Sequence, residues 1–258
     1  MKKFFSRAKI KKLALNMVRM MVIYVMGSLI FVSELWLRSR GKSKVKTRGP
    51  MPRLRQGTIV IANHPDGRHF MWEIFQVPSL FIPQAFGHPI RLSPRIPADK
   101  INFSGLLWGW FYSLFSIPIV RRGKRFNGYT EAREEVEEMI GVLASGGIII
   151  TFIEPGRTCT GTRFVYSRSG RNRIREVSDT IGLLASKVKD AHFIFVWVSR
   201  DKEIVPEPGK KLWGRLDLGE VVTIGFSEMG SRQIAGKKPA EITTLFVNEL
   251  LDLADQIK

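Results

Sequence analysis

The chain has 258 residues, 44% of them hydrophobic, and one cysteine, Cys159. This length suits one α/β domain with an appendage, and a single cysteine excludes an internal disulfide. The formal net charge of +18 invites a nucleic-acid interpretation, but residues 1–55 hold 15 of the 41 Lys and Arg residues and one acid, Glu34. That segment carries +14, so the positive charge does not form a nucleic-acid-binding face on the folded domain.

The N-terminal segment is an apolar run between two basic stretches. The run from Met20 to Ser33 has 14 uncharged residues, and extending it to Leu37 takes in Glu34. A spanning helix needs about 20 apolar residues. We therefore expect residues 1–55 to be a membrane-associating segment, with a helix lying on an anionic membrane surface at the cytoplasmic face. A single transmembrane helix is the alternative.

A basic stretch with two prolines follows, from Lys42 to Gln56. It is typical of a linker, which places the folded domain over residues 56–258. The domain begins with a β-branched run, Thr58–Ala62, that predicts a buried strand. The strand ends in the polar stretch Asn63–His69, which contains His64, Asp66 and His69, before an apolar helical pattern resumes at Phe70.

Two later predicted strands also end in chemically active residues. An uncharged stretch predicts a helix over about 104–115 and a strand from Ser116, which is followed by Arg121 and Arg122. A helix up to Ser145 precedes the strand 148–153, which is followed by Glu154 and Arg157. Sites in open α/β sheets lie at the carboxyl ends of the strands, so these side chains are candidates for one site.

The remaining chain continues the alternation of strands and helices. Residues 157–175 are read as a loop whose six arginines suit phosphate binding. A helix over 178–189, a strand over 193–198, one or two strands over 216–226 and a helix over 239–257 are expected. Within 78–97, rich in proline, only a short strand near 88–92 is expected. The pattern predicts an α/β fold with a largely parallel central sheet, helices on both faces and the N-terminal membrane-associated helix.

The three strand-end motifs resemble those of the glycerolipid acyltransferases, typified by 1-acylglycerol-3-phosphate acyltransferase. That family has Asn-His-x-x-x-x-Asp, then an Ile-Phe/Pro-Ile/Val-x-Arg strand, then Phe-Pro-Glu-Gly-Thr-Arg-Ser. Order and spacing agree over roughly residues 57–200. The chain departs from the family at the aspartate position, which is His69, and the nearest carboxylate is Asp66. Pro155 and Gly156 replace the Gly and Thr of the third motif.

The resemblance implies a membrane-associated acyltransferase of phospholipid biosynthesis, which moves a fatty acyl group from a thioester to a hydroxyl of a lysophospholipid or glycerol-phosphate-type acceptor. The donor would be acyl-coenzyme A or acyl carrier protein, without another cofactor or a metal. Arg121, Arg122 and Arg157 would hold the acceptor phosphate, and Glu154 would orient Arg157 or an acceptor hydroxyl.

The acid–base chemistry centres on His64, because histidine titrates near neutrality and is suited to take a hydroxyl proton. Its second ring nitrogen needs a partner, and either Asp66 or His69 can serve. Two alternatives remain open. His64, Asp66 and His69 are also a possible ligand set for a metal-dependent hydrolase. The histidine at position 69 also fits an inactive membrane-surface relative.

Overall fold

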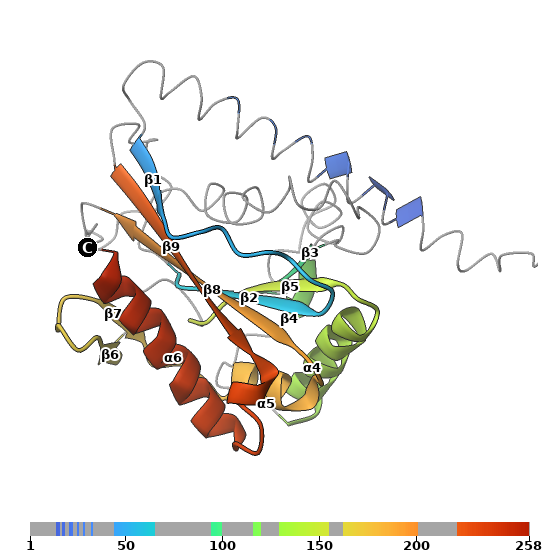
Figure 1. Ribbon diagram of the computed structural model, residues 1–258. Coiled ribbons are helices and arrows are strands. Elements are labelled where there is room, and N and C mark those ends of the chain that lie inside the picture. The colour runs from blue at the N-terminus through green and yellow to red at the C-terminus, as the bar shows by residue number, and fades with distance from the viewer. Residues whose placement is uncertain are drawn as a thin grey trace, which may run out of the picture.

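The computed structural model describes residues 44–64, 94–99, 116–119, 129–154, 162–200 and 221–257, with nine scattered positions between 14 and 32 (Figure 1). The elements in chain order are β1 (Lys44–Arg48), β2 (Thr58–Ala62), β3 (Pro94–Asp99), β4 (Ser116–Ile119), α4 (Tyr129–Ala144), β5 (Ile148–Phe152), β6 (Phe164–Tyr166), β7 (Arg173–Arg175), α5 (Thr180–Lys187), β8 (His192–Arg200), β9 (Val221–Gly230), the 3₁₀ turn η3 (Ser231–Gln233) and α6 (Pro239–Gln256). The described chain is thus a mixed α/β fold.

The central feature is a seven-stranded sheet in the order β1-β9-β8-β2-β5-β3-β4. From β8 to β4 all neighbouring strands are parallel, whereas β9 is antiparallel to β8 and β1 follows the direction of β9. The prediction of a largely parallel sheet is therefore confirmed. Strands β6 and β7 form a separate antiparallel pair.

The core lies between the sheet and the three described helices. Ile59, Ile61 and Phe195 join residues of α4, α5 and α6 in one buried cluster, and the ring of Phe246 on α6 lies 5.3 Å from that of Phe195. The alternate residues, such as Val60, are equally buried. Burial on both faces explains why the central strands are continuous hydrophobic runs. The described helices share one face (Figure 1), so helices on the second face stay a prediction.

The described helices lie close to their predicted ranges. Helices α4, α5 and α6 differ by a few residues at their ends from the expected helices up to Ser145, over 178–189 and over 239–257. The described positions between 14 and 32 are helical as well. Strand β8 contains the expected strand 193–198. The hydrophobic patterns of the sequence therefore predict the helices and strands well where one face or both faces of the element are buried.

The sequence indicated a linker over Lys42–Gln56, but part of this stretch belongs to the sheet. Its residues Lys44–Arg48 form β1, which pairs with Val221 to Gly225 of β9 at the edge of the sheet. Arg48 Nη1 donates to the carbonyl oxygen of Gln256 at 3.5 Å, at the carboxyl end of α6, where a cation is favourable. Lysine and arginine suit an edge strand because they discourage pairing with other chains. The sheet therefore begins before residue 56.

Strand β3 falls in the proline-rich stretch that the sequence indicated as mostly loop, and the expected strand at 88–92 lies outside the described residues. Pro94 is the first residue of β3, a position that tolerates proline. Among the described residues β3 pairs with β5 only at Pro94 and Arg95, and with β4 from Ile96 onward. On its β5 side, Pro97 has no ladder partner among the described residues, and a strand tolerates proline at such a position.

Helices α5 and α6 approach closely at Gly182. A Cβ at this position would collide with the carbonyl oxygen of Pro239 and lie 2.5 Å from Thr243 Oγ1. We expect Gly182→Ala to lower the free energy of unfolding by about 1–3 kcal/mol through overpacking, as measured by urea denaturation. Gly141→Ala on α4 is the matched control, because a Cβ there meets nothing within 4 Å. That change should stabilise the protein by up to about 1 kcal/mol, and equal effects of the two changes would contradict the close approach.

Candidate functional site

The candidate site begins where two central strands end together. β2 and β5 pair in parallel with Ala62 opposite Phe152, and the backbone N–H of Ile153 donates to the carbonyl oxygen of Ala62 at 2.9 Å. This register places the residues that follow each strand, His64 and Glu154, at the same edge of the sheet. The carboxyl edge of a parallel sheet is the usual place for a site.

Asn63 fixes the chain at the end of β2. Its Nδ2 donates to the carbonyl oxygen of Val198 at 3.0 Å, and its Oδ1 accepts from the N–H of Val198 at 2.8 Å. The side chain thereby extends the β2–β8 ladder beyond the strand, and it is only 3% exposed. Because an amide supplies both a donor and an acceptor, asparagine satisfies both buried backbone groups. His64 therefore leaves the sheet from an anchored position.

Glu154 ties three parts of the chain together. Its Oε2 accepts from the backbone N–H of His64 and its Oε1 from the backbone N–H of Arg175, each at 2.7 Å. The residue is 3% exposed, and a carboxylate tolerates such burial when hydrogen bonds compensate for lost water. Both oxygens thus hold backbone groups. The expected role of Glu154 toward Arg157 or an acceptor hydroxyl stays a prediction, because Arg157 lies outside the described residues.

The His64 ring is half-buried and packs against Phe152 of β5. The ring centroids are 4.7 Å apart and the planes are inclined by 33°. The Nδ1 atom is shielded from solvent. With its backbone held by Glu154 and its ring supported by Phe152, the imidazole is preorganised. Its predicted partners, Asp66 and His69, lie outside the described residues, so which of them serves stays open.

The predicted phosphate residues Arg121 and Arg122 also lie outside the described residues, but β4 just precedes them. Strand β4 stands three positions from β2 in the sheet order, which is roughly 14 Å at the usual strand spacing.

The stretch 157–175 is not a simple loop over the part that the structure describes. Residues 164–166 and 173–175 form the β6–β7 hairpin, and three of its arginine side chains contact neighbours. Arg163 pairs with Glu176 at 3.6 Å, Arg168 pairs with Asp252 at 3.6 Å, and the Arg173 guanidinium lies 4.5 Å above the Phe164 ring. These contacts account for their placement without a phosphate.

Arg175 contributes to the site through its backbone, which the sequence did not indicate. Its backbone N–H binds Glu154, while the adjacent Ile174 is fully buried. The alternation Arg173–Ile174–Arg175 is a weak strand signal that could have indicated this hairpin. The backbone contact itself depends on three-dimensional register.

No group of three or more His, Cys, Asp and Glu side chains is placed to hold a metal ion within the described ranges. Two members of the proposed metal-ligand set, Asp66 and His69, lie outside those ranges, so the set as a whole is not placed.

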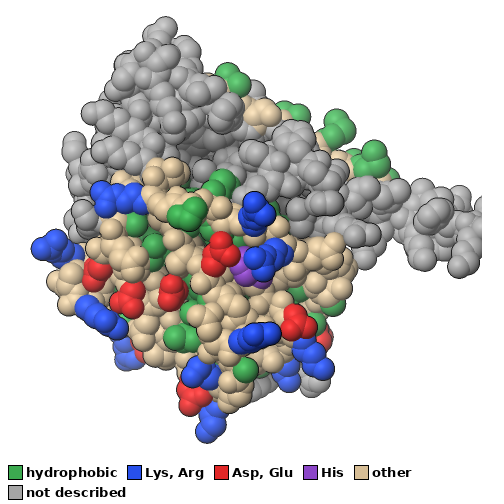
Figure 2. Space-filling view, viewed as in Figure 1, with side chains coloured by type: hydrophobic (Ala, Val, Ile, Leu, Met, Phe, Trp, Pro, Cys, Tyr) green, Lys and Arg blue, Asp and Glu red, His purple; other side chains and the backbone are tan. Residues whose placement is uncertain are grey.

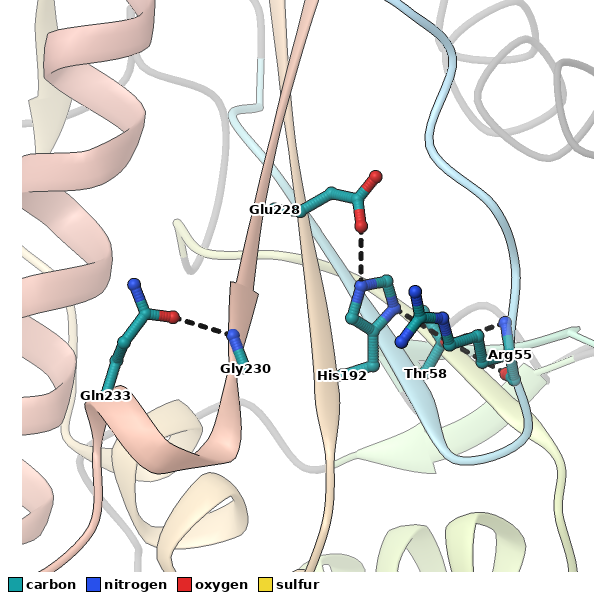
Figure 3. Close-up of polar contacts among 6 residues, drawn as sticks. All are labelled: Arg55, Thr58, His192, Glu228, Gly230 and Gln233. Atoms are coloured by element: carbon teal, nitrogen blue, oxygen red, sulfur yellow. Dashed lines mark hydrogen bonds and ion pairs between the residues drawn. The ribbon is translucent and has the colours of Figure 1, made fainter.

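A second polar cluster lies at the opposite, amino end of the strands (Figure 3). His192 Nε2 lies 2.8 Å from Glu228 Oε2, and His192 Nδ1 lies 3.5 Å from Thr58 Oγ1. Thr58 Oγ1 donates to the carbonyl oxygen of Arg55 and accepts from its N–H. Thr58 and His192 open adjacent parallel strands in register. The cluster therefore fastens the strand starts and is separate from the candidate site.

The described surface of the α/β part mixes charges of both signs. Figure 2 shows Lys and Arg side chains interspersed with Asp and Glu on the visible face. Large hydrophobic side chains of the N-terminal positions are exposed by 40–68%, namely Leu15, Met17, Val18, Met21, Val25 and Val32. Within the part of the chain that the structure describes, no helix has the length and apolar character needed to cross a membrane.

No protein-family model matches the chain, and no curated protein matches its sequence significantly. Among solved structures, it is similar to the crystal structure of the 1-acyl-sn-glycerophosphate (LPA) acyltransferase PlsC from Thermotoga maritima. The TM-score is 0.50 and the identity 14%, over 92% of this chain and 81% of that chain. At such identity the likeness shows a shared fold, and function has to be argued from the site.

Proposed function

We propose that the protein is a membrane-associated acyltransferase. It would move a fatty acyl group from a thioester of coenzyme A or acyl carrier protein to a hydroxyl of a lysophospholipid or glycerol-phosphate-type acceptor. The observation that carries the proposal is the placement of His64, whose backbone N–H is 2.7 Å from Glu154 Oε2 at the carboxyl edge of β2. The fold resembles that of an acyltransferase, which supports the same reaction class.

In this mechanism His64 takes the proton of the acceptor hydroxyl while the oxygen attacks the thioester carbonyl. The carbon–sulfur bond then breaks, and the proton passes to the departing thiolate. Asp66 or His69 would hold the second ring nitrogen and support the imidazolium. Glu154 contributes by fixing the backbone of His64, so the base meets the substrate in one orientation.

The acceptor phosphate would be held by Arg121, Arg122 and Arg157. We expect Arg121→Ala and Arg157→Ala each to weaken use of a phosphate-bearing acceptor by about 1.5–3 kcal/mol, the size of a charge-assisted hydrogen bond. The measurement is kcat/KM with lysophosphatidic acid. Arg168→Ala is the matched control, because Arg168 is exposed and pairs with Asp252. Unchanged acceptor kinetics in both motif variants would remove the phosphate assignment.

The exposed hydrophobic side chains of the N-terminal positions would enter the membrane. We expect the triple substitution of Val18, Met21 and Val25 to serine to weaken binding to anionic vesicles by at least about tenfold, since each fully buried side chain contributes about 1.5–3 kcal/mol. Vesicle sedimentation measures this effect. High salt should weaken binding further by screening the basic flanks.

Tyr166→Ser is the control for this experiment, because Tyr166 is 56% exposed but lies on the β6–β7 hairpin. Equal loss of binding in the control, or none in the triple variant, would contradict insertion of the N-terminal segment. A deletion that tests the same segment should end before Lys44, because residues 44–48 belong to the sheet.

An acceptor and donor panel tests the proposed reaction. Purified protein in vesicles is given labelled acyl-coenzyme A or acyl carrier protein, with lysophosphatidic acid, lysophosphatidylcholine or glycerol 3-phosphate. We expect an acylated product from at least one phosphate-bearing acceptor. Thioester hydrolysis without transfer, or no turnover at all, would favour the hydrolase or the inactive relative.

A further inference from the structure

Asp255 lies at a helix position that is electrostatically unfavourable for a carboxylate. It lies in the last turn of α6, which contains no basic residue, although the carboxyl end of a helix repels negative charge. Its oxygens instead receive three hydrogen bonds from the turn of the β6–β7 hairpin. Ser169 N–H donates to Oδ2 at 3.0 Å, and Ser169 Oγ and Asn172 Nδ2 donate to Oδ1 at 2.7 and 2.8 Å.

The hairpin turn is built to meet this carboxylate. Ser167 and Asn172 are buried, and the Ser167 N–H donates to the Asn172 carbonyl oxygen at 2.9 Å. The Asn172 N–H donates to Ser167 Oγ at 3.2 Å. Burial raises the pKa of Asp255, but the hydrogen bonds from Ser169 and Asn172 outweigh it and hold the pKa well below its usual range. Asp255 is therefore ionised at mildly acidic and neutral pH, where it keeps its hydrogen bonds to Ser169 and Asn172. We call this contact of Asp255 with Ser169 and Asn172 the latch.

The latch is connected to the candidate site by a short path. Asn172 directly precedes β7, and the last residue of β7, Arg175, donates its backbone N–H to Glu154 Oε1 at 2.7 Å. The other oxygen of Glu154 holds the backbone N–H of His64. We propose that Asp255 is a positioning residue, which fixes the hairpin so that Glu154 and, through it, His64 keep their places. Its effect on rate rests on the proposed acyltransferase function, whereas its effect on the backbone does not.

Amide hydrogen exchange of the full chain tests the backbone part of this proposal. At pH 6 we expect Asp255→Asn to increase exchange at the amides of Arg175 and His64 by about tenfold or more, since a charged hydrogen-bond partner is lost. Asp252→Asn is the matched control, because Asp252 lies on the same helix and pairs with the exposed Arg168 at 3.6 Å. It should leave both amides unchanged. An unchanged His64 amide in Asp255→Asn would overturn the proposal.

Ser169→Ala provides a second variant, since it removes one of the three hydrogen bonds to Asp255, together with the Oγ contacts to Ser167 and the Arg171 N–H, and leaves the Ser169 backbone donor in place. It should change the same two amides in the same direction by less. In the transfer assay, Asp255→Asn should lower kcat severalfold without changing KM for the acceptor, because the base is misplaced but the binding groups remain. A larger KM at unchanged kcat would contradict positioning. A wild type without transfer activity would refute the proposed function alone, and the exchange data would still decide on the latch.

Discussion

His64→Ala is expected to lower the rate of acyl transfer by about 10²–10⁴-fold, the contribution typical of one acid–base group. The fold should remain, because the contact of His64 with Glu154 is made by its backbone N–H, and alanine keeps that donor. The substitution removes the packing of the His64 ring on Phe152. The measurement is kcat with saturating donor and acceptor, together with urea denaturation of the same variant.

A second set of variants identifies the side chain that partners the His64 ring. If Asp66 supports the imidazolium, Asp66→Asn should cost nearly as much rate as His64→Ala, because the amide can hold the ring but not stabilise its charge. His69→Asp restores the carboxylate of the family pattern and should recover activity in the Asp66→Asn background. If Asp66→Asn is harmless and His69→Ala abolishes transfer, His69 is the working partner or is itself the base. An unchanged rate in all these variants would exclude the Asn63–His69 stretch as the site.

Glu154→Gln is expected to lower the free energy of unfolding by about 2–4 kcal/mol. The glutamine carbonyl accepts only one of the two backbone N–H groups, and its NH₂ group turns a donor toward the other. One charge-assisted hydrogen bond is then lost in a buried place and the other becomes a weaker neutral one. Urea denaturation, followed by far-UV circular dichroism, measures the difference.

Glu176→Gln is the control for this change. Glu176 adjoins the same hairpin, but its carboxylate is exposed and pairs with exposed Arg163 at 3.6 Å. Such surface pairs contribute about 0–1 kcal/mol, so the control should change stability little. Similar stability of both variants would mean that the Glu154 carboxylate does not hold the backbone as described.

The sequence predicted the fold best where strands are buried on both faces. β2, β5 and the centre of β8 are continuous hydrophobic runs, which are typical of parallel strands buried on both faces. β1 and β3 were missed because they lie toward the edges of the sheet, where lysine and proline are tolerated. The β6–β7 hairpin was missed because its strands have three residues each and β7 has an arginine on either side of its one buried residue, Ile174.

The candidate site was predictable in position but not in detail. His64 and Glu154 follow strong strand signals, so the rule for parallel sheets brings them to one edge. The hydrogen bonds between Asn63 and Val198, and the one from the Arg175 N–H to Glu154, depend on the register of strands that are distant in the sequence. The pairing register of distant strands cannot be deduced from a single sequence. The sequence therefore indicated no structural role for Asn63 and a different one for Glu154.

The proposed acyl transfer by His64 can be measured in a single experiment. Wild-type protein and His64→Ala, each shown to be folded, are incubated in anionic vesicles with lysophosphatidic acid and labelled acyl-coenzyme A, and the diacyl product is quantified. We expect labelled diacyl product with the wild type and a rate lower by about 10²-fold or more with the variant. No product from the folded wild type, or equal product from both proteins, would refute the proposed function.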